Sequence, residues 1–200
     1  MKQKFVNSSI NFITKYQECN DLKLKRLKYG LEGIYGVITK LIIVLIIAIL
    51  TQTIKETALL ILFYGGIRTF SFGWHAKSTL ACLVTTISIY NISPFLISQL
   101  HLPTYIGYFT LIIAFISVIL WAPADTPKRP LIKKDKRLIS KFFSIAIVII
   151  YSIILLFSNS NLINNTIIFA LLIQTIMINP LTYKLTNTRF NNYKYYNTKN

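Results

Sequence analysis

Two long stretches of this chain contain no Asp, Glu, Lys or Arg. They are residues 78–124 and 142–183, which makes them 47 and 42 residues long. A helix needs about 20 apolar residues to cross the hydrocarbon core of a bilayer. Each stretch is therefore long enough for two spans, and turn-forming residues lie near the middle of each. We expect the four spans near 79–98, 104–121, 142–157 and 163–181.

Two further apolar segments lie in the first third of the chain. Residues 41–50 are all aliphatic, and with their neighbours the segment 34–54 reaches membrane length. The segment 58–72 is shorter, and it either crosses the membrane or re-enters on the same side. The sequence thus predicts an all-α, polytopic integral membrane protein with about six transmembrane helices.

The distribution of cations tests this count. The chain has 22 Lys and Arg against 6 Asp and Glu, a formal net charge of +16, although only 14% of its residues are charged. With six spans, the basic N-terminal segment, the loop 122–141 and the tail after Pro180 all lie on one face. Cytoplasmic loops of membrane proteins carry an excess of Lys and Arg. We therefore expect both termini in the cytoplasm, and because the cations flank the spans we expect no nucleic-acid partner.

The N-terminal segment has the pattern of an amphipathic helix. Val6, Ile10 and Ile13 recur at helical intervals among lysines, which is typical of a helix lying on anionic membrane lipids. The alternative is a partly ordered basic arm. The sequence as a whole predicts three parts: a basic N-terminal segment (1–33), a membrane domain (34–183) and a cytoplasmic polar tail (184–200).

One segment of the membrane domain, residues 65–85, combines reactive side chains with three glycines. It holds one of the two histidines and one of the two cysteines of the chain, His75 and Cys82. A thiolate is a strong nucleophile, and histidine is its usual activating base. On one straight helix the pair would lie about 10 Å apart along the axis. A Cys–His pair therefore requires His75 to fold back over the start of a helix that Ser78 caps.

Several neighbours could support such a pair. The N-terminal end of the helix favours the thiolate, and Arg68 and Lys77 add positive charge. Asp125, at the membrane edge on the same side, either orients His75 or caps a local turn. The simpler alternative is that the cysteine is a small apolar side chain and the histidine an interfacial one.

The sequence lacks the motifs that other kinds of chemistry require. It has no His-Glu-x-x-His zinc motif and no phosphate-binding glycine loop. None of the six acids lies deep in a predicted span, which argues against a carboxylate-driven transporter. We therefore expect no metal and no cofactor.

Taken together, these motifs are specific. They are Arg68, the string Gly73-Trp74-His75-Ala76-Lys77-Ser78, Cys82, and Ala122-Pro123-Ala124-Asp125-Thr126 before a basic loop. The chain resembles, over nearly its whole length, the accessory gene regulator B (AgrB) family, membrane endopeptidases of bacterial quorum sensing. Trp74 departs from the family pattern, in which many relatives have a small residue at this position.

The resemblance implies a cysteine endopeptidase of the bacterial cell membrane. Its substrate would be a small pro-peptide of the AgrD type, with His75 as general base and Cys82 as nucleophile. Cys82 would release the C-terminal tail of the pro-peptide and form an acyl-enzyme thioester. A cysteine of the pro-peptide would then attack this thioester and close a thiolactone ring.

The resemblance also implies that the substrate has an acidic tail. The cationic loop 122–141 is either a receptor for this tail or an element that only enforces topology. The receptor would consist of Lys128, Arg129, Lys133, Lys134, Lys136 and Arg137. Two other classes of function stay open, a peptide exporter without covalent chemistry and a non-catalytic membrane scaffold. A homo-oligomer is compatible with all three.

Overall fold

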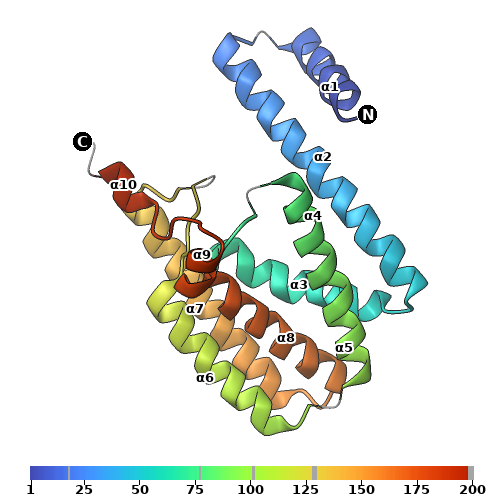
Figure 1. Ribbon diagram of the computed structural model, residues 1–200, viewed down its shortest axis with the longest axis vertical. Coiled ribbons are helices and arrows are strands. Elements are labelled where there is room, and N and C mark those ends of the chain that lie inside the picture. The colour runs from blue at the N-terminus through green and yellow to red at the C-terminus, as the bar shows by residue number, and fades with distance from the viewer. Residues whose placement is uncertain (18, 77, 101, 128–129, 198–200) are drawn as a thin grey trace. The chain divides into compact units, whose positions relative to one another are not determined.

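The computed structural model describes residues 1–17, 19–76, 78–100, 102–127 and 130–197. Figure 1 labels the described elements, which are helices. In chain order they are α1 (Lys2–Tyr16), α2 (Asp21–Leu50), α3 (Ile54–Ser71), α4 (Thr79–Ile87), the π-helix η1 (Ser88–Ile92), α5 (Ser93–Gln99), α6 (Thr104–Trp121), α7 (Lys134–Phe157), α8 (Asn161–Ile178), α9 (Pro180–Leu185) and α10 (Tyr193–Asn197).

The helices confirm the all-α membrane protein. Four are long and apolar enough to cross a membrane: α2, the continuous stretch Thr79–Gln99, α7 and α8. α6 is a shorter apolar helix. α3 has 18 residues but does not reach the same apolar character, because Lys55, Glu56 and Arg68 lie within it. The count of six spans stays a prediction.

Two helix boundaries differ from the expected limits of the loop and of the last span. The second half of the cationic loop is helical, because α7 begins at Lys134 with Asp135 in its first turn, where an acid is favourable. The last predicted span, 163–181, is interrupted: α8 ends at Ile178 and α9 starts at Pro180. Proline lacks the N–H that would continue α8, and the side chain of Asn179 accepts a hydrogen bond from the Leu181 N–H to cap the new helix.

The chain divides into two compact units, residues 1–47 and 48–200. In the first, α1 lies against the N-terminal half of α2. Lys2 pairs with Glu32 at 2.9 Å, and the rings of Phe5 and Tyr35 are 5.5 Å apart. The predicted amphipathic helix is thus confirmed as a helix.

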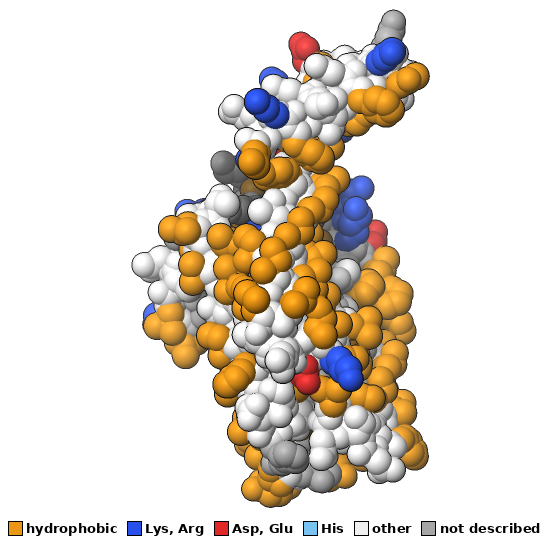
Figure 2. Space-filling model, turned by 90° about the vertical axis from the view of Figure 1, so that its right-hand side faces the viewer, with side chains coloured by type: hydrophobic (Ala, Val, Ile, Leu, Met, Phe, Trp, Pro, Cys, Tyr) orange, Lys and Arg blue, Asp and Glu red, His pale blue; other side chains and the backbone are white. Residues whose placement is uncertain are grey.

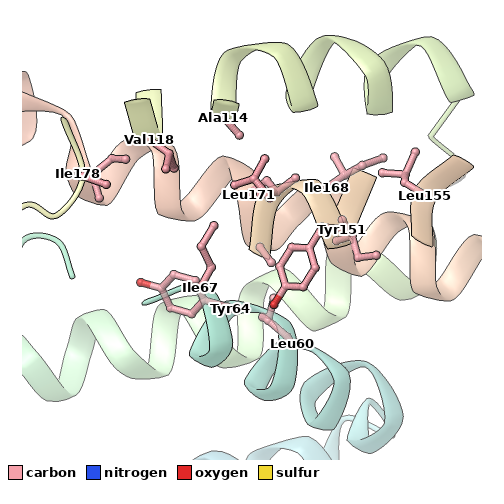
Figure 3. Close-up of a cluster of buried hydrophobic side chains, with 14 of the residues drawn as sticks. Leu60, Tyr64, Ile67, Ala114, Val118, Tyr151, Leu155, Ile168, Leu171 and Ile178 are labelled. Carbon is pink, nitrogen blue, oxygen red and sulfur yellow. The ribbon is translucent and has the colours of Figure 1, made fainter. Parts of the chain in front are cut away.

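The second unit is organised around α8, which packs against α3 and α6, while α7 packs against the same two helices. Figure 3 shows the buried core where they meet, with Tyr64 and Ile67 from α3, Val118 from α6 and Leu171 from α8. Figure 2 shows hydrophobic side chains over much of the visible surface, with Lys and Arg in small groups. An apolar exterior of this kind is expected of helices whose solvent is lipid.

Candidate active site

Cys82 lies in the first turn of α4. Ser78, in an extended conformation, accepts a hydrogen bond from the Ala81 N–H through its hydroxyl at 3.1 Å. Its carbonyl accepts a second hydrogen bond from the Cys82 N–H at 3.0 Å. The predicted cap is confirmed, and it places the Cys82 thiol at the N-terminal end of the helix, where backbone N–H groups and the helix dipole favour negative charge.

His75 folds back to this helix start. Its Nε2 atom lies 3.7 Å from Sγ of Cys82, and its Nδ1 atom lies 3.0 Å from the carbonyl oxygen of Ala76. A carbonyl can only accept, so Nδ1 carries the hydrogen and Nε2 presents its lone pair to the thiol. The His75 side chain is exposed and the Cys82 side chain is half-buried. The imidazole can therefore take the thiol proton at a position that a polypeptide can reach.

The backbone before His75 turns sharply. α3 ends at Ser71, and Phe72 follows with φ 58° and ψ −132°. Gly73 has φ +125°, a region that residues with a side chain rarely adopt. A Cβ at Gly73 would also lie 3.1 Å from the carbonyl oxygen of Met177, which is backbone of α8. Two separate constraints thus require glycine at this position.

Two segments from later in the chain hold this turn. The Gly73 N–H donates to the Ala124 carbonyl at 2.9 Å, and the Ala124 N–H donates to the Ser71 carbonyl at 3.0 Å, which forms an isolated parallel bridge. Tyr183 of α9 also donates to the Ala124 carbonyl, at 3.0 Å. Burial raises the pKa of Tyr183, so its hydroxyl stays protonated as a donor. The motif around Ala124 is therefore built into the wall of the site.

The end of α8 forms the other support, which sequence reasoning missed. Gln174 is buried, and its Nε2 donates to Ser71 Oγ at 2.6 Å and to the Phe72 carbonyl at 2.9 Å. The Trp74 N–H donates to the Met177 carbonyl at 2.7 Å. A glutamine inside an apolar span was the available signal, because polar groups at membrane depth are costly unless they are paired.

Arg68 forms a hydrogen bond with the backbone next to His75. Its guanidinium donates to the Trp74 carbonyl at 2.8 Å and to the Tyr64 hydroxyl at 2.6 Å. The structure thus gives Arg68 a role in holding the backbone next to His75. Its expected charge support for a thiolate stays a prediction, and Lys77, expected to help it, lies outside the described residues.

Asp125 is fully buried and anchors backbone. Its carboxylate accepts hydrogen bonds from the N–H groups of Leu131 (3.1 Å), Asn192 (2.8 Å) and Tyr193 (3.0 Å). These contacts are of the capping kind, the second of the two roles expected for it. Nδ1 of His75, the atom that an orienting carboxylate would bind, is instead placed on the Ala76 carbonyl.

Asp125→Asn should therefore destabilise the protein. The amide keeps the size of the side chain but replaces one acceptor oxygen by an N–H₂ group that faces backbone donors. We expect a loss of about 2 kcal/mol, because hydrogen bonds to charged groups are strong and a buried unpaired donor is costly. Thermal unfolding in detergent measures it, with the exposed Asp135→Asn as the matched control. An Asp125→Asn variant as stable as this control would contradict the anchor.

The residues of the predicted cationic receptor differ in their exposure to solvent. Lys133, Lys134 and Lys136 are exposed around the start of α7. Arg137 is half-buried and stacks over the Tyr193 ring at 3.6 Å. Lys128 and Arg129 lie outside the described residues. Across the part of the chain that the structure describes, no cluster of three or more His, Cys, Asp or Glu could hold a metal ion.

Comparison with known proteins identifies relatives of this site and fold. The family described as Accessory gene regulator B matches residues 6–178. An AgrB-like protein of Listeria innocua serovar 6a is 34% identical over 172 residues, which cover 86% of this chain and 84% of that protein. An AgrB-like protein of Clostridium acetobutylicum is 28% identical over 181 residues, 90% of this chain and 87% of that protein.

A third relative is named Accessory gene regulator protein B, from Staphylococcus carnosus. It is 31% identical over 128 residues, which cover 62% of this chain and 67% of that protein. No solved structure is significantly similar to the chain.

Proposed function

Because the chain belongs to the accessory gene regulator B family, which takes part in quorum sensing, we propose that it is a membrane cysteine endopeptidase that processes an AgrD-type pro-peptide. The observation that carries this proposal is the 3.7 Å separation of Cys82 Sγ and His75 Nε2 at the capped start of α4. Membership of the family is the reason for proposing this class of substrate, and the geometry of the pair is the reason for proposing Cys82 as nucleophile and His75 as its base.

The first step releases the tail of the pro-peptide. Nε2 of His75 takes the thiol proton, and Sγ of Cys82 attacks the carbonyl carbon at the C-terminal end of the future signal. The S–C bond forms as the peptide C–N bond breaks. The imidazolium then gives its proton to the leaving amine, which departs with the tail. The product is a thioester between Cys82 and the N-terminal part of the pro-peptide.

The second step closes the ring. A cysteine thiol of the pro-peptide attacks the thioester carbonyl, its S–C bond forms, and the bond to Cys82 Sγ breaks. His75, neutral again after the first step, takes the proton of the attacking thiol and gives it to the departing Cys82 sulfur. Attacking and leaving groups are both thiols, so the exchange needs no other reactant. Exclusion of water from the thioester would prevent hydrolysis to a linear peptide, which gives a site at the membrane surface a purpose.

The remaining expectations complete the proposal. The protein is a multi-pass protein of the bacterial cell membrane with both termini in the cytoplasm. The three lysines at the start of α7, Lys133, Lys134 and Lys136, attract the acidic tail of the substrate, since opposite charges steer association. α1, which carries Lys2, Lys4 and Lys15, lies on anionic lipids.

Cysteine alkylation tests the pair without any substrate. The chain has two partly exposed thiols, Cys82 beside His75 and Cys19 in the connection between α1 and α2, so Cys19 is an internal reference. We expect iodoacetamide to modify Cys82 at least about tenfold faster than Cys19, because a base within reach supplies the reactive thiolate. His75→Ala should abolish this difference. Peptide mass spectrometry gives both rates in one sample. Equal alkylation rates of Cys82 and Cys19 in the protein without substitutions would contradict the activation of Cys82 by His75.

A further inference from the structure

The polypeptide after α8 returns to the active site. In Figure 1 the C-terminal segment with α9 and α10 lies beside the start of α7 and the connection that leads from α6. Residues 186–193 of this segment contact three parts of the site described above: Asp125, Arg137 and Trp74. Residues 186–193 of the predicted polar tail therefore pack against Trp74, next to His75, and against the residues that hold this part of the chain.

Asp125 is the main anchor of this segment. Its carboxylate accepts hydrogen bonds from three backbone N–H groups. Two of these groups, those of Asn192 and Tyr193, belong to the tail. The Asn192 side chain donates in turn to the Asp125 carbonyl at 3.3 Å, and it is buried. A buried carboxylate is stable only when its oxygens are paired. The docked tail supplies most of that pairing.

Aromatic contacts hold the same segment on either side of the anchor. The guanidinium of Arg137 lies 3.6 Å from the centre of the Tyr193 ring. The ring of Phe190 packs edge-on against Tyr183 at 5.1 Å, and Tyr183 itself donates to the Ala124 carbonyl. Cation–π and edge-to-face contacts of this kind favour one fixed arrangement over a mobile tail.

The docked tail reaches the residue that precedes His75. Nε1 of Trp74 donates to the Thr188 hydroxyl at 3.2 Å. Thr188 is itself fixed, because its N–H donates to the Tyr183 carbonyl at 2.8 Å. Trp74 is thus held at its N–H by Met177, at its carbonyl by Arg68 and at its indole by the tail. The first two contacts fix the backbone, and the third fixes the side chain.

We propose that residues 186–193 are a positioning element of the active site, docked on Asp125 and holding Trp74 through Thr188, so that His75 stays aligned with Cys82. This inference rests on the proposed function. It assigns a task to the Trp74 side chain, which the proposed reaction does not itself use. It also makes Asp125 a positioning residue that acts through the tail and does not touch the substrate.

A double-mutant cycle on the Trp74–Thr188 hydrogen bond tests the proposal. Trp74→Phe keeps an aromatic ring but removes the N–H, and Thr188→Val keeps the shape but removes the hydroxyl. In the full-length protein in membrane vesicles, we expect each variant to lower kcat for tail release about fivefold, the value of one hydrogen bond. KM should stay within about twofold, because the bond does not touch substrate. The double variant should lose no more than either single variant, and Thr188→Ser should restore kcat.

Two readouts separate the inference from the proposed function. Thr188→Val should also lower the ratio of Cys82 to Cys19 alkylation, which needs no substrate. Unchanged kcat and an unchanged ratio in both single variants would overturn the positioning role, as would effects that multiply to about 25-fold in the double variant. If Cys82→Ser still cleaves the pro-peptide, the proposed function fails, and the alkylation ratio alone then decides the role of the tail.

Discussion

Replacing Cys82 by Ser, or His75 by Ala, should abolish cleavage of the pro-peptide tail. The first change removes the thiol whose Sγ lies 3.7 Å from Nε2 of His75, and the second removes that base. A nucleophile and its base act as one unit, so each single change should lower the rate by at least about 10³-fold and the double variant should be no worse. Electrophoretic separation of intact and processed pro-peptide after co-expression measures the loss.

The matched control for these variants is Cys19→Ser, which removes the other thiol of the chain. It should process the pro-peptide at the rate of the unaltered protein. All variants should also reach the membrane in equal amounts, since the His75 side chain is exposed and the Cys82 side chain only half-buried. Tail cleavage that survives in both Cys82→Ser and His75→Ala would favour the peptide exporter or the scaffold over the endopeptidase.

Gly73→Ala should have the second largest effect, although Gly73 carries no reactive group. Its φ of +125° is unfavourable for alanine, and the new Cβ would meet the Met177 backbone at 3.1 Å. The strain is on the order of 1–3 kcal/mol, and relief of it must shift the turn that leads to His75. A displacement of about 1 Å at a catalytic group can cost about 10²-fold in rate. We expect a loss of this size in kcat for tail release.

Gly36→Ala provides the comparison, because a Cβ at Gly36 of α2 meets no atom within 4 Å. Alanine also favours helix more than glycine does, so this variant should be as active and at least as stable as the unaltered protein. If Gly73→Ala and Gly36→Ala behave alike, the close approach of the turn to α8 has no part in positioning His75.

Local chemistry explains why part of this structure could be predicted from the sequence. A bilayer accepts only segments whose backbone polar groups are paired internally, and the uncharged stretches 78–124 and 142–183 have the length that is typical of membrane-spanning helices. The cap at Ser78 and the approach of His75 to Cys82 depend on residues within eight positions of one another. Helix geometry predicts the cap directly, but for the pair it set only a condition, that His75 leave the helix and fold back over its start.

The supports of the site could not be predicted in the same way. Gln174, Met177 and Thr188 contact residues 71–74 from about a hundred residues away, and no periodic pattern marks them. The sequence could not decide between the two roles expected for Asp125 for the same reason. Its partners in the tail come close to it only in the folded chain. The end of α8 had a local signal in Pro180, but the continuous hydrophobicity of the segment concealed it.

Trapping the acyl-enzyme tests most directly whether Cys82 is the nucleophile. The protein is co-expressed with a pro-peptide whose ring-forming cysteine is replaced by Ala, so that tail release can proceed but ring closure cannot. We predict that intact-mass and peptide mass spectrometry will find Cys82 carrying the N-terminal fragment of the pro-peptide less one water, and that hydroxylamine will remove it as expected for a thioester. Release of the tail with Cys82 unmodified, or the same adduct on Cys19, would show that Cys82 is not the nucleophile.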